Sequence, residues 1–109
     1  MALHHRSTTT RASRAEAAAA EIRESGGRAI AVGADLHSTD LIASMIERVT
    51  SELGPVEVLV TATSAYRTER FAEISDASWA VALDALLGAT FRTCRTVVPA
   101  MQTPAGAGS

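Results

Sequence analysis

Residues 52–65, ELGPVEVLVTATSA, are expected to contain the end of a helix, a buried strand and the start of a loop. Gly54 can adopt the left-handed conformation that often follows the last turn of a helix, and Pro55 cannot continue a helix. Four of the five residues Val56–Val60 are Val or Leu, and such a run is typical of a parallel strand covered on both faces. Ligands of open α/β sheets bind beyond the carboxyl ends of the strands. The small polar residues 61–64 therefore stand where a site is expected.

Strands and helices alternate on both sides of this segment. The expected strands are residues 2–6, 28–33 and 56–60, and the expected helices are residues 11–25, 38–53 and 78–100. Alternation of this kind is typical of a parallel sheet joined by right-handed crossovers. The predicted fold class is α/β in three layers, with a parallel sheet of about three strands and helices on both faces.

The composition limits the classes of function. With 109 residues the chain is most simply one domain. A hydrophobic content of 47% and a formal net charge of −2 lack the basic excess that is typical of nucleic-acid binding. No apolar run approaches the roughly 20 residues of a membrane-spanning helix, and the first ten residues lack a signal-peptide core, so a cytoplasmic protein is expected. All ten basic residues are arginines, which excludes any mechanism of this chain that requires a lysine.

A series of short motifs occurs along the chain. In chain order these are Gly26-Gly27, Ala34-Asp35-Leu36, Leu53 to Val60, Trp79 with Leu83-Asp84, and Arg95 to Pro99 with Met101. In this order and at these spacings they resemble the short-chain dehydrogenase/reductase family. The resemblance covers nearly all of residues 1–103 and implies a partial NAD(P)-binding Rossmann domain there. Residues 104–109, which contain Pro and two Gly, are expected to form a flexible tail.

The resemblance also implies which parts of the family pattern this sequence lacks. The family's first strand and Gly-rich phosphate loop have no counterpart before Met1, and its catalytic serine and Tyr-x-x-x-Lys motif have none at the other end. The only tyrosine, Tyr66, has Arg70 rather than lysine four residues on, and Leu86 stands at the position of the catalytic asparagine. The family's Asn-Asn-Ala-Gly is replaced by Thr-Ala-Thr-Ser at residues 61–64.

Two functions are consistent with this pattern. The first is a fragment or remnant of an NAD(P)-dependent short-chain oxidoreductase, whose family chemistry is hydride transfer between NAD(P)H and a carbonyl or alcohol substrate. Such a chain is expected to be inactive alone, and a small-molecule substrate is expected only for a complete protein. The alternative is a noncatalytic module that binds a nucleotide or another protein.

Arg6 and Ser7 match the place where family members that prefer NADP hold the ribose phosphate. A guanidinium suits a phosphate because it offers paired donors in a plane. The alternative for Arg6 is a solvated arginine in a loop. Because the phosphate loop is absent from the pattern, binding of NADP, or of NAD, is expected to be weak.

Four further residues match cofactor-contacting positions of the family. Asp35 and Leu36 correspond to the pair that flanks the adenine, although Asp35 can also be a loop carboxylate near the start of a helix. The backbone of Thr61 and Ala62 can contact a nucleotide whichever side chains these residues carry.

His4 and His5 are neighbours on a strand, so they point to opposite faces and cannot chelate one metal together. No metal is therefore expected.

The family's strand order, 3-2-1-4, leads to two structural predictions. Because the first strand has no counterpart here, the strand at residues 2–6 is expected to pair directly with the strand at residues 56–60, which makes Val58 a central core residue. The apolar face of the helix at residues 78–100 is wide enough to cover a sheet and also to touch a partner. Self-association through this helix is therefore expected.

Overall fold

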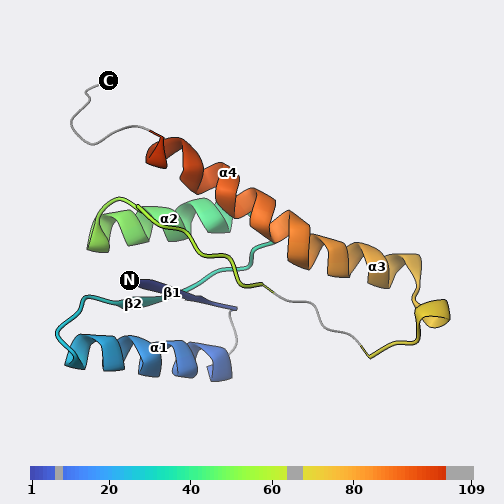
Figure 1. Cartoon of the computed structure of the whole chain (residues 1–109), viewed down its shortest axis with the longest axis horizontal. Helices are drawn as coiled ribbons and strands as arrows, with labels where there is room; N and C mark the ends of the chain where they lie inside the picture. The colour runs from blue at the N-terminus through green and yellow to red at the C-terminus, as the bar shows by residue number, and fades with distance from the viewer. Residues whose placement is uncertain (7–8, 64–67, 103–109) are drawn as a thin grey trace.

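The structure, a computed structural model, describes residues 1–6, 9–63 and 68–102 (Figure 1). The elements follow in chain order as β1 (Ala2–His5), α1 (Thr9–Glu24), β2 (Ile30–Gly33), α2 (Thr39–Leu53), the 3-10 turn η1 (Phe71–Glu73), α3 (Asp76–Leu83), the π-helical turn η2 (Asp84–Gly88) and α4 (Ala89–Met101). The tail predicted at residues 104–109 lies outside the described residues.

β1 and β2 form a parallel sheet, in which Ala2 lies opposite Ile30 and His5 lies opposite Gly33. The connection between the strands is α1, which lies on one side of the sheet, while α2 lies on the other side (Figure 1). The predicted α/β class and its layers are thereby confirmed. Within the described residues the sheet has two strands, so the prediction of about three is wrong.

Both ends of α2 are fixed by local hydrogen bonds, and the sequence predicts the end at Gly54. At the start, the Ser38 side chain accepts a hydrogen bond from the backbone N–H of Leu41 at 3.2 Å, which satisfies one of the free donors of the first turn. At the end, Gly54 has φ +94°, and its N–H donates to the carbonyl of Thr50 at 3.0 Å. This φ favours glycine because a Cβ would clash with the backbone.

The main core lies between β2 and α2. Ile42 is completely buried, and with Met45 and Val49 it forms the inward stripe of the helix. Val32 and Ala34, from β2 and the residue after it, complete the cluster. Because these side chains follow the 3.6-residue period of one element and the alternation of the other, the core could be predicted from sequence.

The segment after α2 differs from the prediction. Residues 56–60 form no strand, and they run as coil after α2 (Figure 1). Val56 packs against the core, but Val58 and Val60 are 78% and 81% exposed. The predictions that this segment pairs with β1 and that Val58 is a central core residue are wrong. An apolar pattern forms a strand only where a neighbour accepts and donates the backbone hydrogen bonds, and among the residues that the structure describes β1 pairs with β2 alone.

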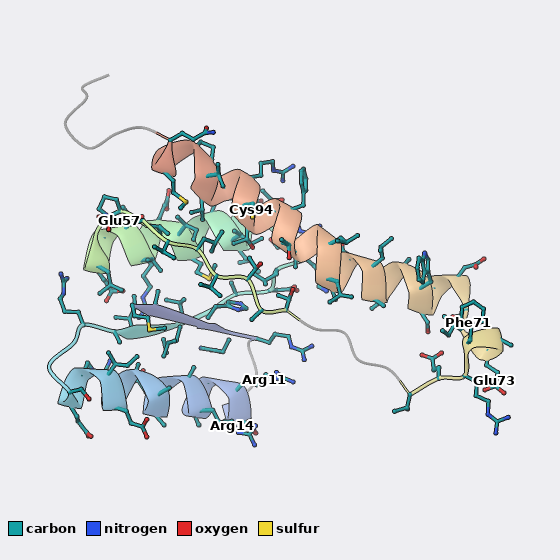
Figure 2. The ribbon with its side chains drawn as sticks, in the orientation of Figure 1. Arg11, Arg14, Glu57, Phe71, Glu73 and Cys94 are labelled. Atoms are coloured by element: carbon teal, nitrogen blue, oxygen red, sulfur yellow. The ribbon has the colours of Figure 1, made fainter. Side chains whose placement is uncertain are left out.

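The helix predicted at residues 78–100 is present as α3, η2 and α4, which follow one another without a break from Asp76 to Met101. Ser75 caps it by accepting a hydrogen bond from the N–H of Ser78 at 3.0 Å. α4 packs on α2, whereas α3 extends away from the sheet and leads back to η1, where Phe71 is 92% exposed (Figures 1 and 2). In the described part of the chain, no helix is long and apolar enough to cross a membrane.

Candidate functional site

The carboxyl ends of β1 and β2 meet at one edge of the sheet. Because His5 and Gly33 are in register, the two strands end level with each other. The N–H of Ala34 donates to the carbonyl of His5 at 3.3 Å and extends the ladder by one bond. Arg6 follows β1 directly, and residues 35–36 follow β2 after one residue. The structure thus brings Arg6 and the predicted adenine-flanking pair to the same edge.

The loop between β2 and α2 has a defined shape. The Asp35 carboxylate accepts a hydrogen bond from the backbone N–H of His37 at 2.9 Å, and the Asp35 carbonyl accepts one from the N–H of Ser38 at 3.1 Å. A bond from the Asp side chain to the N–H two residues further on is an Asx turn, which stabilises the loop before a helix. Asp35 remains exposed, while the Leu36 side chain packs against the core. The Asp35 carboxylate therefore faces solvent at this edge, and the burial of Leu36 anchors the loop that carries it.

A second set of contacts ties this loop to the helix of residues 76–101. The Arg92 guanidinium donates to both carboxylate oxygens of Asp84, at 2.9 Å and 2.7 Å. Its Nε donates to the carbonyl oxygen of Leu36 at 2.7 Å. The ring of His37 hydrogen-bonds through Nδ1 to the same Asp84 carboxylate. We call Arg92, Asp84 and His37 the loop clamp.

The charges of the loop clamp support one another. Paired hydrogen bonds from Arg92, with a further one from His37, lower the pKa of Asp84 from 3.8 to about 2. The same carboxylate raises the pKa of Arg92, and the nearby Asp35 adds to this effect. Asp84 therefore stays ionised over the whole neutral range, and Arg92 stays positively charged.

The other predicted cofactor residues are Arg6, which lies at this edge, and Thr61, Ala62 and Ser7. Thr61 and Ala62 are exposed and lie in coil after residues 56–60. Arg6 is exposed. Ser7 lies outside the described residues. No group of three or more His, Cys, Asp or Glu residues suited to a metal is found among the described residues.

Sequence reasoning missed the loop clamp as a site. Asp84 and Arg92 are eight residues apart, or about 12 Å along an ideal helix, whereas pairs on a helix are ordinarily sought at three or four residues. A signal was present in Gly88, which lies midway between them on the same helix. Because glycine is unfavourable inside a helix, Gly88 could have indicated that neighbouring side chains pass over the helix at this residue.

An open groove with a volume of about 460 Å³ lies elsewhere, between α2 and α4. Its lining consists of Ala43, Ile46, Glu47, Thr50, Ser51 and Thr96. None of the predicted cofactor residues belongs to this lining. The candidate site is therefore the sheet edge rather than the groove.

The sequence matches the family described as short chain dehydrogenase over residues 3–109. The chain belongs to the short-chain dehydrogenase family. The resemblance expected from the sequence motifs is confirmed. An acetoacetyl-CoA reductase from Allochromatium vinosum is 34% identical over 87 residues, which make up 75% of this chain and 35% of that relative.

Solved structures of short-chain dehydrogenases have the same fold over most of this chain. A dehydrogenase/reductase from Sinorhizobium meliloti superposes with a TM-score of 0.81 at 26% identity, covering 90% of this chain and 38% of that one. A dehydrogenase from Burkholderia cenocepacia with bound NADP superposes with a TM-score of 0.78 at 20% identity, covering 86% and 35%. The chain thus spans about a third of the length of the short-chain dehydrogenases that it matches.

Proposed function

We propose that this short-chain dehydrogenase chain binds the adenosine end of NADP at the carboxyl ends of β1 and β2. The observation that carries the proposal is the pairing of His5 with Gly33, the last residues of the two strands, because it places both carboxyl ends at the same edge. It brings an exposed guanidinium, Arg6, to the same edge as the exposed Asp35 carboxylate. The first group suits a ribose phosphate, and the second suits hydroxyl or amino donors of a nucleoside. NADP bound to the B. cenocepacia relative, which has the same fold, also favours this ligand.

Weak binding is expected because the remaining donors are few. In Rossmann folds the pyrophosphate is bound by backbone N–H groups of a Gly-rich loop at a helix N-terminus, and no such motif occurs in this sequence. Thr61 and Ala62 can contribute backbone contacts along the nucleotide. The adenosine end therefore carries most of the affinity, and NADP is preferred over NAD through its extra phosphate.

Calorimetry with NADP and NAD tests the proposal. Replacing Arg6→Ala removes the phosphate contact, and we expect about a tenfold loss of affinity for NADP, since a hydrogen bond to a charged group contributes about 1.5 kcal/mol or more. Affinity for NAD should stay unchanged. Arg14→Ala removes another exposed arginine, on α1, and is the matched control. Equal binding of both cofactors by the wild-type protein, or an unchanged NADP affinity in Arg6→Ala, would remove Arg6 from the site.

We propose further that hydride transfer requires groups that this chain does not contribute. The chain has no lysine, and Leu86, an alkyl side chain, stands at the position that the family resemblance assigns to the catalytic asparagine. General acid catalysis at a carbonyl needs a positioned donor of suitable pKa. The purified chain should therefore reduce no ketone with NADPH. Turnover that exceeds a protein-free blank and disappears on heating would contradict this.

Self-association is the second candidate function, and the exposed helix favours it. Trp79, Leu83, Leu87 and Phe91 recur every four residues along α3, η2 and α4. They are 61%, 40%, 65% and 59% exposed. We call these four residues the apolar stripe. A row of exposed apolar side chains of this kind is typical of an interaction site, and we propose that a second copy of the chain covers it. Sedimentation over a concentration series tests this proposal.

A further inference from the structure

The loop clamp uses the Arg92 side chain in an unusual way. Three of its N–H groups are bound, two by Asp84 on its own helix and one by the carbonyl of Leu36. Leu36 and Arg92 are 56 residues apart in the sequence. Only 16% of the Arg92 side chain is exposed, so this arginine is a link between two elements rather than a solvated surface charge.

The clamp holds two consecutive residues of the loop. Arg92 holds the carbonyl of Leu36, and Asp84 binds the ring of His37. The backbone N–H of His37 in turn donates to the Asp35 carboxylate at 2.9 Å. The direction of the Asp35 side chain therefore depends on the position of His37. Through these contacts, the helix determines where the exposed carboxylate lies.

Gly88 leaves the space that this arrangement needs. A Cβ at this position would lie 2.9 Å from Cγ of Asp84 and 3.1 Å from Nη1 of Arg92. Any side chain at residue 88 would thus displace the Asp84 carboxylate from the position in which it binds Arg92. Gly88 has ordinary helical angles, with φ −63° and ψ −45°, so its backbone does not require glycine. A glycine inside a helix costs about 1 kcal/mol relative to alanine, and here the crossing side chains explain it.

The clamp also coincides with the π-helical turn. η2 runs from Asp84 to Gly88. The turn therefore begins at the residue whose carboxylate binds Arg92 and ends at the glycine beside which the Arg92 guanidinium passes. Single π-helical turns inside α-helices occur frequently at functional sites. The irregular turn, the glycine and the reach of Arg92 are therefore parts of one local arrangement.

We infer that Arg92, supported by Asp84 and Gly88, is a positioning residue that holds loop residues 35–37 in the conformation that receives the adenosine end of the nucleotide. The inference rests on the proposed NADP site, and it adds a residue that itself touches no cofactor. Without the clamp the loop samples several conformations, and only a fraction of them presents Asp35 correctly. The apparent dissociation constant rises in inverse proportion to that fraction.

Two variants break the clamp in different ways. Arg92→Met keeps the length of the side chain but removes its donors. Gly88→Ala keeps every donor and acceptor but fills the space between them. Arg95→Met is the matched control, because Arg95 lies one turn further along α4, is exposed, and reaches Thr39 rather than the loop. Arg92→Lys keeps the charge but cannot bind the carboxylate through two parallel donors, so it should restore only part of the loss.

The primary readout is the backbone order of the free protein, measured by nitrogen-15 relaxation. In the wild-type protein the amides of Leu36 and His37 should have order parameters near those of a rigid backbone, about 0.85, and in Arg92→Met and Gly88→Ala they should fall below about 0.6. Ile42 in the core of α2 should stay rigid in every variant. NADP affinity should fall about tenfold in the two variants if the competent conformation is populated a tenth of the time. Arg95→Met should change neither quantity.

The two readouts separate this inference from the proposed function. If the wild-type protein binds no NADP, the proposed site fails, while the order parameters still decide whether the clamp holds the loop. Unchanged order at His37 in Gly88→Ala would overturn the inference. Equal loss of order at Ile42 would also overturn it, since Arg92 would then stabilise the whole fold rather than the loop. If Arg92→Met does not fold, Gly88→Ala and Arg92→Lys decide the question in the same way.

Discussion

Leu87→Ala should weaken self-association of the chain far more than it weakens the fold. Leu87 is 65% exposed and lies in the middle of the apolar stripe, between Leu83 and Phe91. Complete burial of a Leu side chain contributes about 1.5 to 3 kcal/mol. Since about two thirds of Leu87 is still available, its burial in an interface contributes about 1 to 2 kcal/mol per subunit.

Symmetry doubles this contribution. In a twofold interface the same patch is used by both subunits, so each Leu87 counts once in each. Loss of both side chains therefore costs about 2 to 4 kcal/mol, which raises the dissociation constant of the dimer about 30-fold to 1,000-fold. Because exposed side chains away from the core usually change the stability of a monomer by no more than about 0.5 kcal/mol, the denaturation midpoint of dilute protein should barely move.

Sedimentation velocity over a range of protein concentrations is the assay. Leu41→Ala is the matched control, because Leu41 is a 50%-exposed Leu on α2 and is not part of the apolar stripe. It should leave the dissociation constant of the dimer unchanged. A wild-type protein that stays monomeric at high concentration, or a Leu87→Ala variant that dimerises as well as wild type, would refute the reasoning.

Three further predictions concern the fold. Ile42→Ala should lower the free energy of unfolding, measured by urea titration, by about 2 to 5 kcal/mol because the side chain is completely buried. A smaller loss in Ile42→Ala than in Ile42→Val would contradict the assignment of Ile42 to the core. The pKa of Asp84 falls from 3.8 to about 2 on folding, so its contribution to stability is complete above pH 3.8 and is lost as the pH falls through 2. In urea titrations at a series of pH values, Asp84→Asn should reduce the loss of unfolding free energy between these two pH values. Amides of residues 56–60 should exchange with solvent faster than those of α2, and slow exchange there would indicate a strand.

The sequence predicted the elements whose signals are local. Gly54, expected from the sequence to end a helix, ends α2 with a positive φ. The parallel pairing of β1 and β2 also followed, because a helix of this length between two short strands returns the chain in the same direction. Cap residues, periodicity and connection length act over a few positions, so a single sequence contains what is needed to read them.

Contacts across long distances in the sequence could not be read in this way. Arg92 and Leu36 meet because α4 packs on α2 and so lies near the loop that precedes α2. No local pattern links residues 56 positions apart. The position of Arg6 and Asp35 at one edge could be predicted, by contrast, since parallel strands place their carboxyl ends on the same side.

Residues 56–60 show why a strand pattern is not sufficient for a strand. β propensity spans about 1 kcal/mol between residue types and depends mainly on packing against neighbours. Each backbone group left unpaired in a buried position costs about 1 to 3 kcal/mol, so a short apolar segment without a partner edge is more stable as solvated coil. Val56 packs against the core and Leu59 is half-buried, whereas Val58 and Val60 remain in solvent because burial without paired backbone would cost more than their side chains gain.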